Sequence, residues 1–409
     1  MNPAARYTLI VLTLINLFNY LDRYVVSALV ETLKKSELQL TDLQVGMLVP
    51  GFMLVYMLAS PVFGVLGDRG SRPRLIALGV AIWSAATAMG GLAGSFVSLL
   101  GARAAVGIGE AAYGTIAPAV IADSFPVKLR GRVFAVFFSA IPIGSALGFV
   151  LGGLVNQAYG WRAAFYVAGL PGLALALLTL KLKDPPRGGE DEAGAVPKDA
   201  APPGFKQYWE LRKNKMYAGT VLGNAAYTFG LGGLAFWMPA FLERTRGIPQ
   251  ADASIHFGAV VVVTGFVGTF VGGWLGDRML KKDPQAYLHL SGLATLIAAP
   301  FVAIALMSPD PTILWGGIVI AELLLFASTG PINSAILGFV NPARRAMAGA
   351  ACNFTIHLLG DVPSPPLIGW ISDRSSLGTA VLMVPVSIAI SGIIWLLCAR
   401  AGRREAARS

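Results

Sequence analysis

The sequence contains few charged residues. Of its 409 residues, 13% are Asp, Glu, Lys or Arg and 55% are hydrophobic, whereas a soluble domain carries roughly 25% charged residues. This deficit is typical of a protein whose main solvent is lipid. The net charge of +10 does not indicate a nucleic-acid partner, because the basic residues separate apolar runs and do not gather on one face or in an arm.

Residues that ligate metals or attack substrates are also scarce. The two cysteines, Cys352 and Cys398, both lie in apolar segments, which excludes a disulfide framework and a cysteine-based metal site. The three histidines, His256, His289 and His357, lie on different segments, so an enzyme would lack a paired nucleophile and base. The G-x-x-x-x-G-K-[ST] motif of nucleotide-binding pumps is missing. We therefore expect no enzyme, no ATP-driven pump, no metal and no cofactor.

Long apolar runs fill most of the chain. Each approaches the ~20 residues that an α-helix needs to cross the hydrocarbon core. We therefore predict an all-α membrane protein with twelve transmembrane helices. The runs fall at about 7–30, 44–66, 74–95, 97–121, 133–156, 162–180, 216–241, 256–276, 287–307, 312–339, 346–370 and 377–398.

The stretch 181–215 has a different composition and divides the chain into halves, 1–180 and 216–398. Residues Asp184–Gly204 are rich in Pro, Gly, Ala and acidic residues, which is typical of a flexible linker. Residues Phe205–Lys215 mix aromatic and basic side chains and predict a short helix on the membrane surface, although a solvated connector would have the same composition.

The distribution of Lys and Arg predicts the orientation. With the N-terminus inside, 24 of the 32 basic residues lie in inner segments, the basic tail 399–409 included, six lie in outer loops, and Arg23 and Arg103 lie within spans. Cytoplasmic loops carry the excess of positive charge. Both termini and the 181–215 linker are therefore expected in the cytoplasm.

One loop sequence occurs twice. Gly64–Arg69 follows the second run and Gly273–Arg278 follows the eighth, so that Asp68 and Asp277 are 209 residues apart, about half the chain. A duplication of six helices explains the equivalent positions of the two copies. Both copies fall on the inner side. We expect Asp68, Arg69, Arg72, Asp277 and Arg278 to hold an inner gate shut, the acids pairing with inner-side basic residues or helix ends.

These loops carry a resemblance to the major facilitator superfamily. Its loop between the second and third helices reads G-x-L-x-D-R-x-G-R-[RK]; Gly64, Leu66, Asp68, Arg69 and Arg72 match it, and Ser71 replaces a glycine. Further matches are Arg103, Gly107 and Gly109 in the fourth run and Gly144, Gly148, Gly152 and Gly153 in the fifth. The resemblance implies two pseudo-symmetric six-helix bundles and secondary transport by alternating access.

Longer segments resemble the Spinster branch of that superfamily. They are Asn19–Arg23, Gly109–Tyr113, Ile116–Pro118, Ala140–Ser145 and His357–Pro365. This resemblance implies a proton-coupled transporter of a lysophospholipid or a sphingosine-type lipid, expected here as a monomer among membrane lipids. The short tails and compact loops favour a bacterial inner membrane. If the likeness extends only to the fold, the substrate is instead a drug, an organic anion or a sugar-phosphate.

Charged residues within the apolar runs are candidates for function, because burying a charge in a membrane is costly. Counting 1.5 Å per residue places Asp22 and Arg103 at matching depths, roughly 10 and 9 Å below the outer surface. Glu110 lies two helical turns from Arg103, on the same face. A carboxyl that alternates between burial and a nearby guanidinium takes up and releases protons. We therefore predict proton coupling by Asp22, Arg103 and Glu110; static ion pairs that only orient helices are the alternative.

The candidate substrate ligands are Arg23, Tyr113, Glu322, His357 and Asp361. His357 and Asp361 are four residues apart and share a helical face. Prolines at 363, 365 and 366 break the run beside Asp361, as in the discontinuous helices of transporter binding sites. With Glu322 this pair could contact a headgroup or relay protons. Arg23 could instead extend toward the outer surface.

The charge distribution predicts the side on which the linker lies. A protease site introduced at Gly194 should be cut when protease is added to the cytoplasmic face of membrane vesicles, and not from the opposite face. Cleavage only from the outer face would contradict the predicted orientation.

Overall fold

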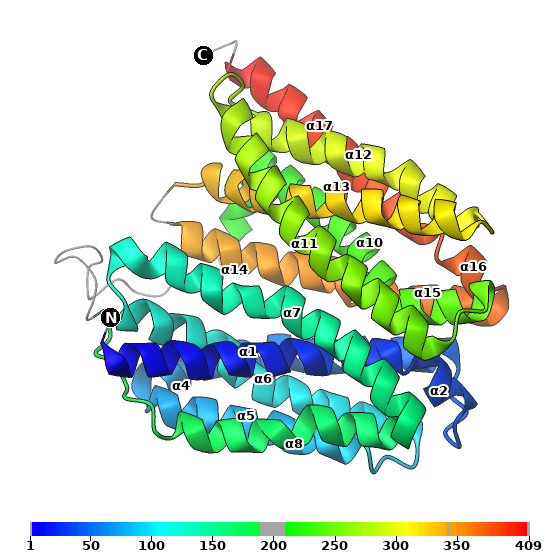
Figure 1. Ribbon diagram of the computed structural model, residues 1–409. Coiled ribbons are helices and arrows are strands. Elements are labelled where there is room, and N and C mark those ends of the chain that lie inside the picture. The colour runs from blue at the N-terminus through cyan, green and yellow to red at the C-terminus, as the bar shows by residue number, and fades with distance from the viewer. Residues whose placement is uncertain (1, 189–208, 342–343, 407–409) are drawn as a thin grey trace. The chain divides into compact units, whose positions relative to one another are not determined.

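The structure is a computed structural model, and it describes residues 2–188, 209–341 and 344–406 (Figure 1). The described residues form helices joined by short turns, and none of them lies in a strand. The chain divides into two compact units. The first comprises Met1–Ala200 and Gly247–Gly258, and the second comprises Ala201–Arg246 and Ala259–Ser409.

The first unit is built from closely packed pairs of helices. Helix α1 packs along α7 and also contacts α6 and α8, and α6 packs between α4 and α5. The start of α11 also belongs to this unit. The helices are α1 (Pro3–Ala28), α2 (Val30–Lys35), α3 (Asp42–Gly46), α4 (Leu48–Arg69), α5 (Arg72–Gly90), α6 (Phe96–Ser124), α7 (Val127–Tyr159) and α8 (Trp161–Thr179).

The second unit is organised around α10 and α12. Helix α10 packs on α17 and on the η3 segment, and α12 packs on α13 and α17. Its elements are η1 (Leu211–Lys213), α10 (Lys215–Arg246), α11 (Gln250–Leu280), α12 (Ala286–Met307), α13 (Pro311–Gly338), α14 (Arg345–Ile356), η3 (His357–Asp361), α15 (Ser364–Arg374), α16 (Leu377–Ala380) and α17 (Met383–Ala406).

Eleven helical segments in the described part of the chain are long and apolar enough to cross a membrane. The predicted run at 346–370 is not among them, because it is divided into α14, the π-helical η3 and α15. The break falls beside Pro363, as predicted, and Pro365 opens the α15 helix. The described residues therefore contain eleven continuous helices of membrane-spanning length and one apolar run that is interrupted.

Glycines on α7 allow α1 to approach closely. Gly144 and Gly148 lie one turn apart on α7; a Cβ at Gly144 would lie 2.4 Å from the Leu17 carbonyl oxygen, and one at Gly148 would lie 2.5 Å from that of Leu21. Both distances are shorter than van der Waals contact. The glycine spacing recognised in the sequence is therefore the seam that holds α1 in place, directly beside Asp22.

Residues at the start of the predicted linker are bound to the first unit. The Arg72 side chain is 4% exposed; it donates to Asp184 Oδ1 at 2.7 Å and to Asp123 Oδ2 at 2.5 Å. Arg187 donates to the carbonyl oxygens of Gly67 and Gly70, both at 2.8 Å. The prediction of a flexible linker from Asp184 onward is therefore wrong for residues 184–188, and residues 189–204 lie outside the described part.

Only the end of the predicted surface helix is described, since residues 205–208 lie outside the described residues. Trp209 and Glu210 are helical and lead into η1. The guanidinium of Arg212 lies 4.2 Å from the Trp209 ring centroid. This pairing of a basic and an aromatic side chain agrees with an interfacial segment.

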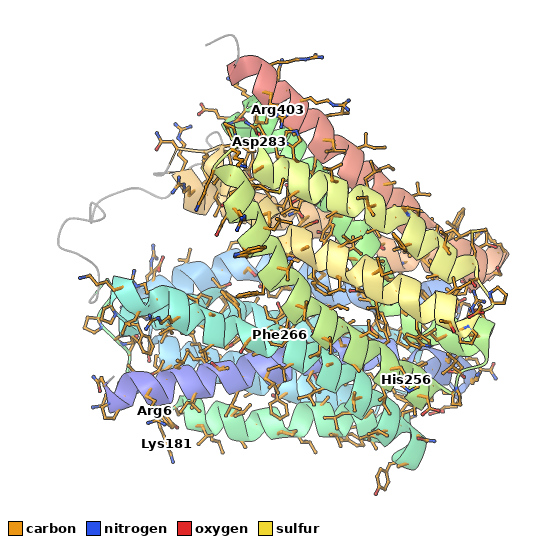
Figure 2. All side chains as sticks on the ribbon, turned by 45° about the horizontal axis from the view of Figure 1, so that its top comes forward. Arg6, Lys181, His256, Phe266, Asp283 and Arg403 are labelled. Carbon is orange, nitrogen blue, oxygen red and sulfur yellow. The ribbon has the colours of Figure 1, made fainter. Side chains whose placement is uncertain are left out.

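The last turns of α17 are tied to the connection between α11 and α12. Figure 2 shows Asp283 and Arg403 near each other, and Arg403 Nη2 donates to Asp283 Oδ2 at 2.8 Å. His289 Nδ1 lies 2.6 Å from the same oxygen. Burial opposes ionisation of Asp283, but Arg403, the backbone N–H of Gln285 and His289 outweigh it and hold its pKa below the usual value. This connection therefore keeps its negative charge at neutral pH.

The α1–α7 seam makes a testable prediction about stability. Gly148→Ala should destabilise the protein by about 1–3 kcal/mol, because the added methyl group overpacks the seam. Gly131→Ala on the same helix is the matched control, since a Cβ there would meet no atom within 4 Å. Thermal unfolding of the two purified variants in detergent measures the difference. Equal melting temperatures would contradict the packing argument.

Candidate functional site

Helices α1 and α6 place a buried ion pair inside the first unit. Arg103 Nη1 on α6 donates to Asp22 Oδ2 at 3.1 Å and to Oδ1 at 3.3 Å. The two side chains are 5% and 0% exposed. The partners expected from depth counting along the two helices are thus in contact.

A second ion pair lies on the same two helices. Arg23 reaches Glu110 Oε2 with Nε at 2.9 Å and with Nη2 at 2.7 Å. The alternative position of Arg23 is therefore not observed, because its side chain turns to Glu110 and does not extend to the outer surface. Within the predicted cluster, the guanidinium that contacts Glu110 is that of Arg23. Arg23 follows Asp22 directly on α1, and its side chain is long enough to contact the Glu110 carboxylate on α6.

The Arg23 side chain is 21% exposed, whereas its Glu110 partner is fully buried. Its guanidinium carbon lies 5.1, 5.0 and 5.5 Å from the ring centroids of Tyr20, Phe52 and Tyr56. Such positions favour a cation through the negative faces of the rings. The site therefore presents one partly accessible cation inside an aromatic frame.

Sequence reasoning missed these three rings. Phe52 and Tyr56 lie four residues apart on α4, so they share a face, and Phe52 also lies 5.5 Å from the Arg103 guanidinium carbon. The four-residue spacing was a usable signal. Nothing in the sequence, however, indicated that this face of α4 meets α1 and α6.

Several polar atoms of this cluster are buried without a hydrogen-bond partner among the described residues. They are Asn19 Nδ2, Arg103 Nε and Glu110 Oε1. Unsatisfied buried polar atoms are costly, and each one in a folded protein requires an explanation, such as a functional role or a bound water molecule. Each of the three belongs to a side chain at or beside an ion pair.

Tyr113, predicted as a substrate ligand, is buried between α6 and α1. Its side chain is 2% exposed, its hydroxyl donates to the Leu12 carbonyl oxygen at 2.7 Å, and its ring meets that of Trp83 at 5.7 Å between centroids. The hydroxyl therefore fastens α6 to α1, one helical turn along α6 from Glu110.

In the second unit, two of the three predicted candidates are in direct contact. His357 Nδ1 lies 3.0 Å from both carboxylate oxygens of Asp361 within η3, and the two side chains are 26% and 20% exposed. Glu322 lies on α13, 1% exposed, with Oε2 unpartnered. No hydrogen bond or ion pair in the described residues joins Glu322 to the pair on η3.

Helix α10 supports the interrupted span. Trp237 Nε1 donates to the Pro365 carbonyl oxygen at 3.1 Å, and Ser364 Oγ donates to the Phe229 carbonyl oxygen at 2.6 Å. These bonds satisfy backbone and side-chain groups at the break, which an apolar solvent could not do.

The second unit also carries an apolar groove with a volume of about 680 Å³. Most of its wall comes from one face of α10 and one face of α17, with Leu359 of η3 beside them. The lining residues on those two helices are Leu222, Ala225, Ala226, Phe229, Met383, Val386, Ser387 and Ile390.

The five predicted gate residues differ in their surroundings. Asp68 and Arg69 are exposed, whereas Arg72 is buried in the contacts with Asp123 and Asp184 described above. In the second copy of the loop sequence, Asp277 Oδ1 accepts from the Tyr287 hydroxyl at 2.7 Å. Arg278 lies over the Trp274 ring at 5.7 Å. The two copies share a sequence but not their partners.

Comparison with known proteins agrees with this architecture. The family profile described as Major Facilitator Superfamily matches residues 12–365. A crystal structure of a bacterial homolog to the human lysosomal transporter Spinster, in an inward-facing and unoccupied conformation, superposes with a TM-score of 0.88 at 27% identity. The match covers 98% of both chains.

Three sequence relatives are informative. Protein spinster homolog 3 of Danio rerio is 36% identical, over 95% of this chain and 83% of its own length. Protein spinster of Drosophila melanogaster is 32% identical, over 90% and 62%. The sphingosine-1-phosphate transporter SPNS2 of Mus musculus is 33% identical, over 95% and 76%.

The buried Asp22–Arg103 pair makes a prediction about stability. Arg103→Leu alone should cost about 3–5 kcal/mol, because it leaves a carboxylate buried without its partner. The double variant Asp22→Asn with Arg103→Leu should regain most of that loss, since the uncompensated charge is gone. Thermal unfolding of the single and double variants completes the cycle. A double variant no more stable than Arg103→Leu would contradict the pairing.

Proposed function

Because the chain belongs to the Spinster branch of the major facilitator superfamily and is a membrane transporter, we propose that its cargo is an amphiphilic lipid. The substrate class is a lysophospholipid or a sphingosine-type lipid. Transport proceeds by alternating access of two six-helix bundles and is coupled to protons. The observation that carries the proposal is the Arg23–Glu110 ion pair, in which a buried carboxylate holds a partly accessible guanidinium.

Charge balance links the substrate to the proton. Asp22, Arg23, Arg103 and Glu110 are two acids and two cations, so the cluster is neutral when all four are ionised. A phosphate that binds Arg23 withdraws the cation from Glu110. The buried carboxylate is then uncompensated, and taking up a proton removes that cost. Release of the proton returns Arg23 to Glu110 and expels the anion.

The residues divide these tasks. Arg23 contacts the anionic headgroup, because a guanidinium binds phosphate oxygens through two parallel N–H bonds. Glu110 carries the proton that accompanies this exchange. Asp22 neutralises Arg103, which stays charged throughout, and it provides a second titratable carboxyl.

The lipid character of the cargo rests on different support. The relative SPNS2 is named for sphingosine-1-phosphate, which joins a phosphate to a long apolar chain. The groove on α10 and α17 supplies an apolar wall of a size typical of small-molecule sites. The His357–Asp361 pair on η3 is a further polar contact for a headgroup, and Glu322 is a second buried carboxyl for proton relay.

The remaining assignments complete the proposal. The protein acts as a monomer in a bacterial inner membrane with both termini in the cytoplasm, in line with the excess of basic residues on that side. The inner gate is formed around Asp68, Arg69, Asp277 and Arg278, with Arg72 holding the first of these loops. No cofactor takes part.

Flux into liposomes that contain the purified protein tests both parts of the proposal. Labelled lysophospholipid should accumulate faster with an imposed pH gradient than without one. Unlabelled lysophospholipid or sphingosine-1-phosphate should compete, while soluble drugs, organic anions and sugar-phosphates should not. Equal transport of those soluble compounds, without competition by lipid, would replace the lipid with the alternative cargo.

Neutral variants then separate coupling from binding. Glu110→Gln keeps the size and hydrogen bonding of the side chain and removes its titration. Flux in this variant should no longer respond to the pH gradient, and Asp22→Asn should weaken the response. If both variants keep full gradient-dependent flux, the ion pairs are structural and the proton site lies elsewhere.

A further inference from the structure

A cavity with a volume of about 360 Å³ lies in the second unit, between η1 and the connection from α13 to α14. Its volume falls within the range of small-molecule sites, about 300–1,000 Å³. None of its residues belongs to the cluster on α1 and α6, to the groove on α10 and α17, or to η3. The lining residues are Glu210, Leu211, Asn214, Phe339, Val340, Asn341 and Arg344.

One part of the cavity wall is apolar. Leu211 and Val340 are 7% and 8% exposed, and Phe339 precedes Val340 at the end of α13. Asn214 Nδ2 donates to the Phe339 carbonyl oxygen at 2.7 Å, and Asn214 Oδ1 accepts from the Tyr217 backbone N–H at 3.0 Å. This amide therefore fastens η1 and the start of α10 to the end of α13, which keeps the two sides of the cavity together.

The residues around the opening are basic. Arg344 lines the cavity, and Arg345 follows it as the first residue of α14. Lys213 and Lys215 flank the lining residue Asn214. All four basic side chains are exposed. Charges at such distances act together, because they lie within a Debye length of about 8–10 Å of the opening. The cavity therefore attracts an anion.

The acid in the lining, Glu210, holds Arg344 only loosely. Arg344 Nη1 lies 3.6 Å from Glu210 Oε2, and the two side chains are 52% and 36% exposed. An exposed ion pair of this kind contributes little to stability. A phosphate group can therefore take the guanidinium from the carboxylate, since it accepts two parallel N–H bonds from an arginine.

The combination of an apolar wall and a basic opening fits an amphiphile better than a soluble anion, which has no use for the apolar side. Trp209 and Arg212, which lead into and belong to η1, pair as in an interfacial segment. On the proposed orientation this end of the second unit faces the inner leaflet, whose anionic lipids attract basic segments.

We propose that this cavity binds the headgroup of an anionic phospholipid of the surrounding membrane. Arg344 contacts the phosphate, and the apolar wall contacts the glycerol and the first carbons of the chains. The lipid at this site is a resident ligand and not the cargo. The inference goes beyond the proposed function and does not depend on the identity of the transported molecule.

The experiment measures the binding of phosphatidylglycerol to the purified protein in detergent micelles. The rise in melting temperature with lipid concentration gives the affinity, because a ligand that binds only the folded state stabilises it. Arg344→Gln should weaken the affinity about fivefold, the contribution of one basic residue near an anionic lipid. The side chain is half exposed, so the change does not disturb the packed interior.

Arg404→Gln is the matched control. Arg404 is an exposed arginine near the end of α17, on the same proposed side of the membrane, and it does not line the cavity. This variant removes the same charge and should leave the affinity as it is in the parent protein. An equal loss of affinity in both variants, or no loss in Arg344→Gln, would overturn the site.

Glu210→Gln tests the exchange of partners. It should tighten the binding of phosphatidylglycerol in the parent protein, because the carboxylate no longer competes for the guanidinium. In the Arg344→Gln background the same change should have a smaller effect, since that guanidinium is gone. Equal effects in the two backgrounds would mean that only the overall charge matters, and the proposed contact would be wrong.

Two further arms identify the source of the phosphate and the place of binding. Glycerol 3-phosphate, which carries the phosphate without the chains, should not stabilise the protein at the same concentrations; equal stabilisation would replace the lipid with a soluble anion. Arg23→Gln should keep the response to phosphatidylglycerol. If Arg23→Gln abolishes the response while Arg344→Gln keeps it, the lipid occupies the proposed cargo site and the present inference fails, whereas the proposed function stands.

Discussion

A charge in an apolar environment must have a partner, and much of the first unit is organised around this requirement. Two guanidinium groups and two carboxylates lie on α1 and α6, each acid with its own cation. The desolvation cost of such groups is several kcal/mol per ion unless geometry and hydrogen bonds are good. The helices that carry them therefore have to be held in a defined register.

Packing contacts and one hydrogen bond between neighbouring helices provide that register. The glycines of α7 let its backbone approach α1 beside Asp22, and the Tyr113 hydroxyl fastens α6 to the α1 backbone at Leu12. Arg23 is the most exposed member of the cluster, with 21% of its side chain accessible against 5% for Arg103.

The two halves of the chain share a repeated loop sequence, but the residues of the two copies have different contact partners. The duplicated loop sequences are equivalent by position, yet Arg72 is buried between two aspartates while Asp277 accepts from a tyrosine. The first unit keeps its titratable groups on continuous helices. The second presents a His–Asp pair on a π-helical segment, a departure from α-helix that is frequent at functional sites.

By itself, the sequence determined the membrane class, the number of spans and the break beside Pro363, because these depend on local composition and on the length of apolar runs. It also determined the Asp22–Arg103 pair, since depth along a straight helix follows from residue count. Only the tertiary structure decided that Glu110 takes Arg23 and that Phe52 and Tyr56 frame the cation. These outcomes depend on the rotation of each helix about its axis and on the reach of long side chains, which neighbouring helices impose and a single segment does not encode.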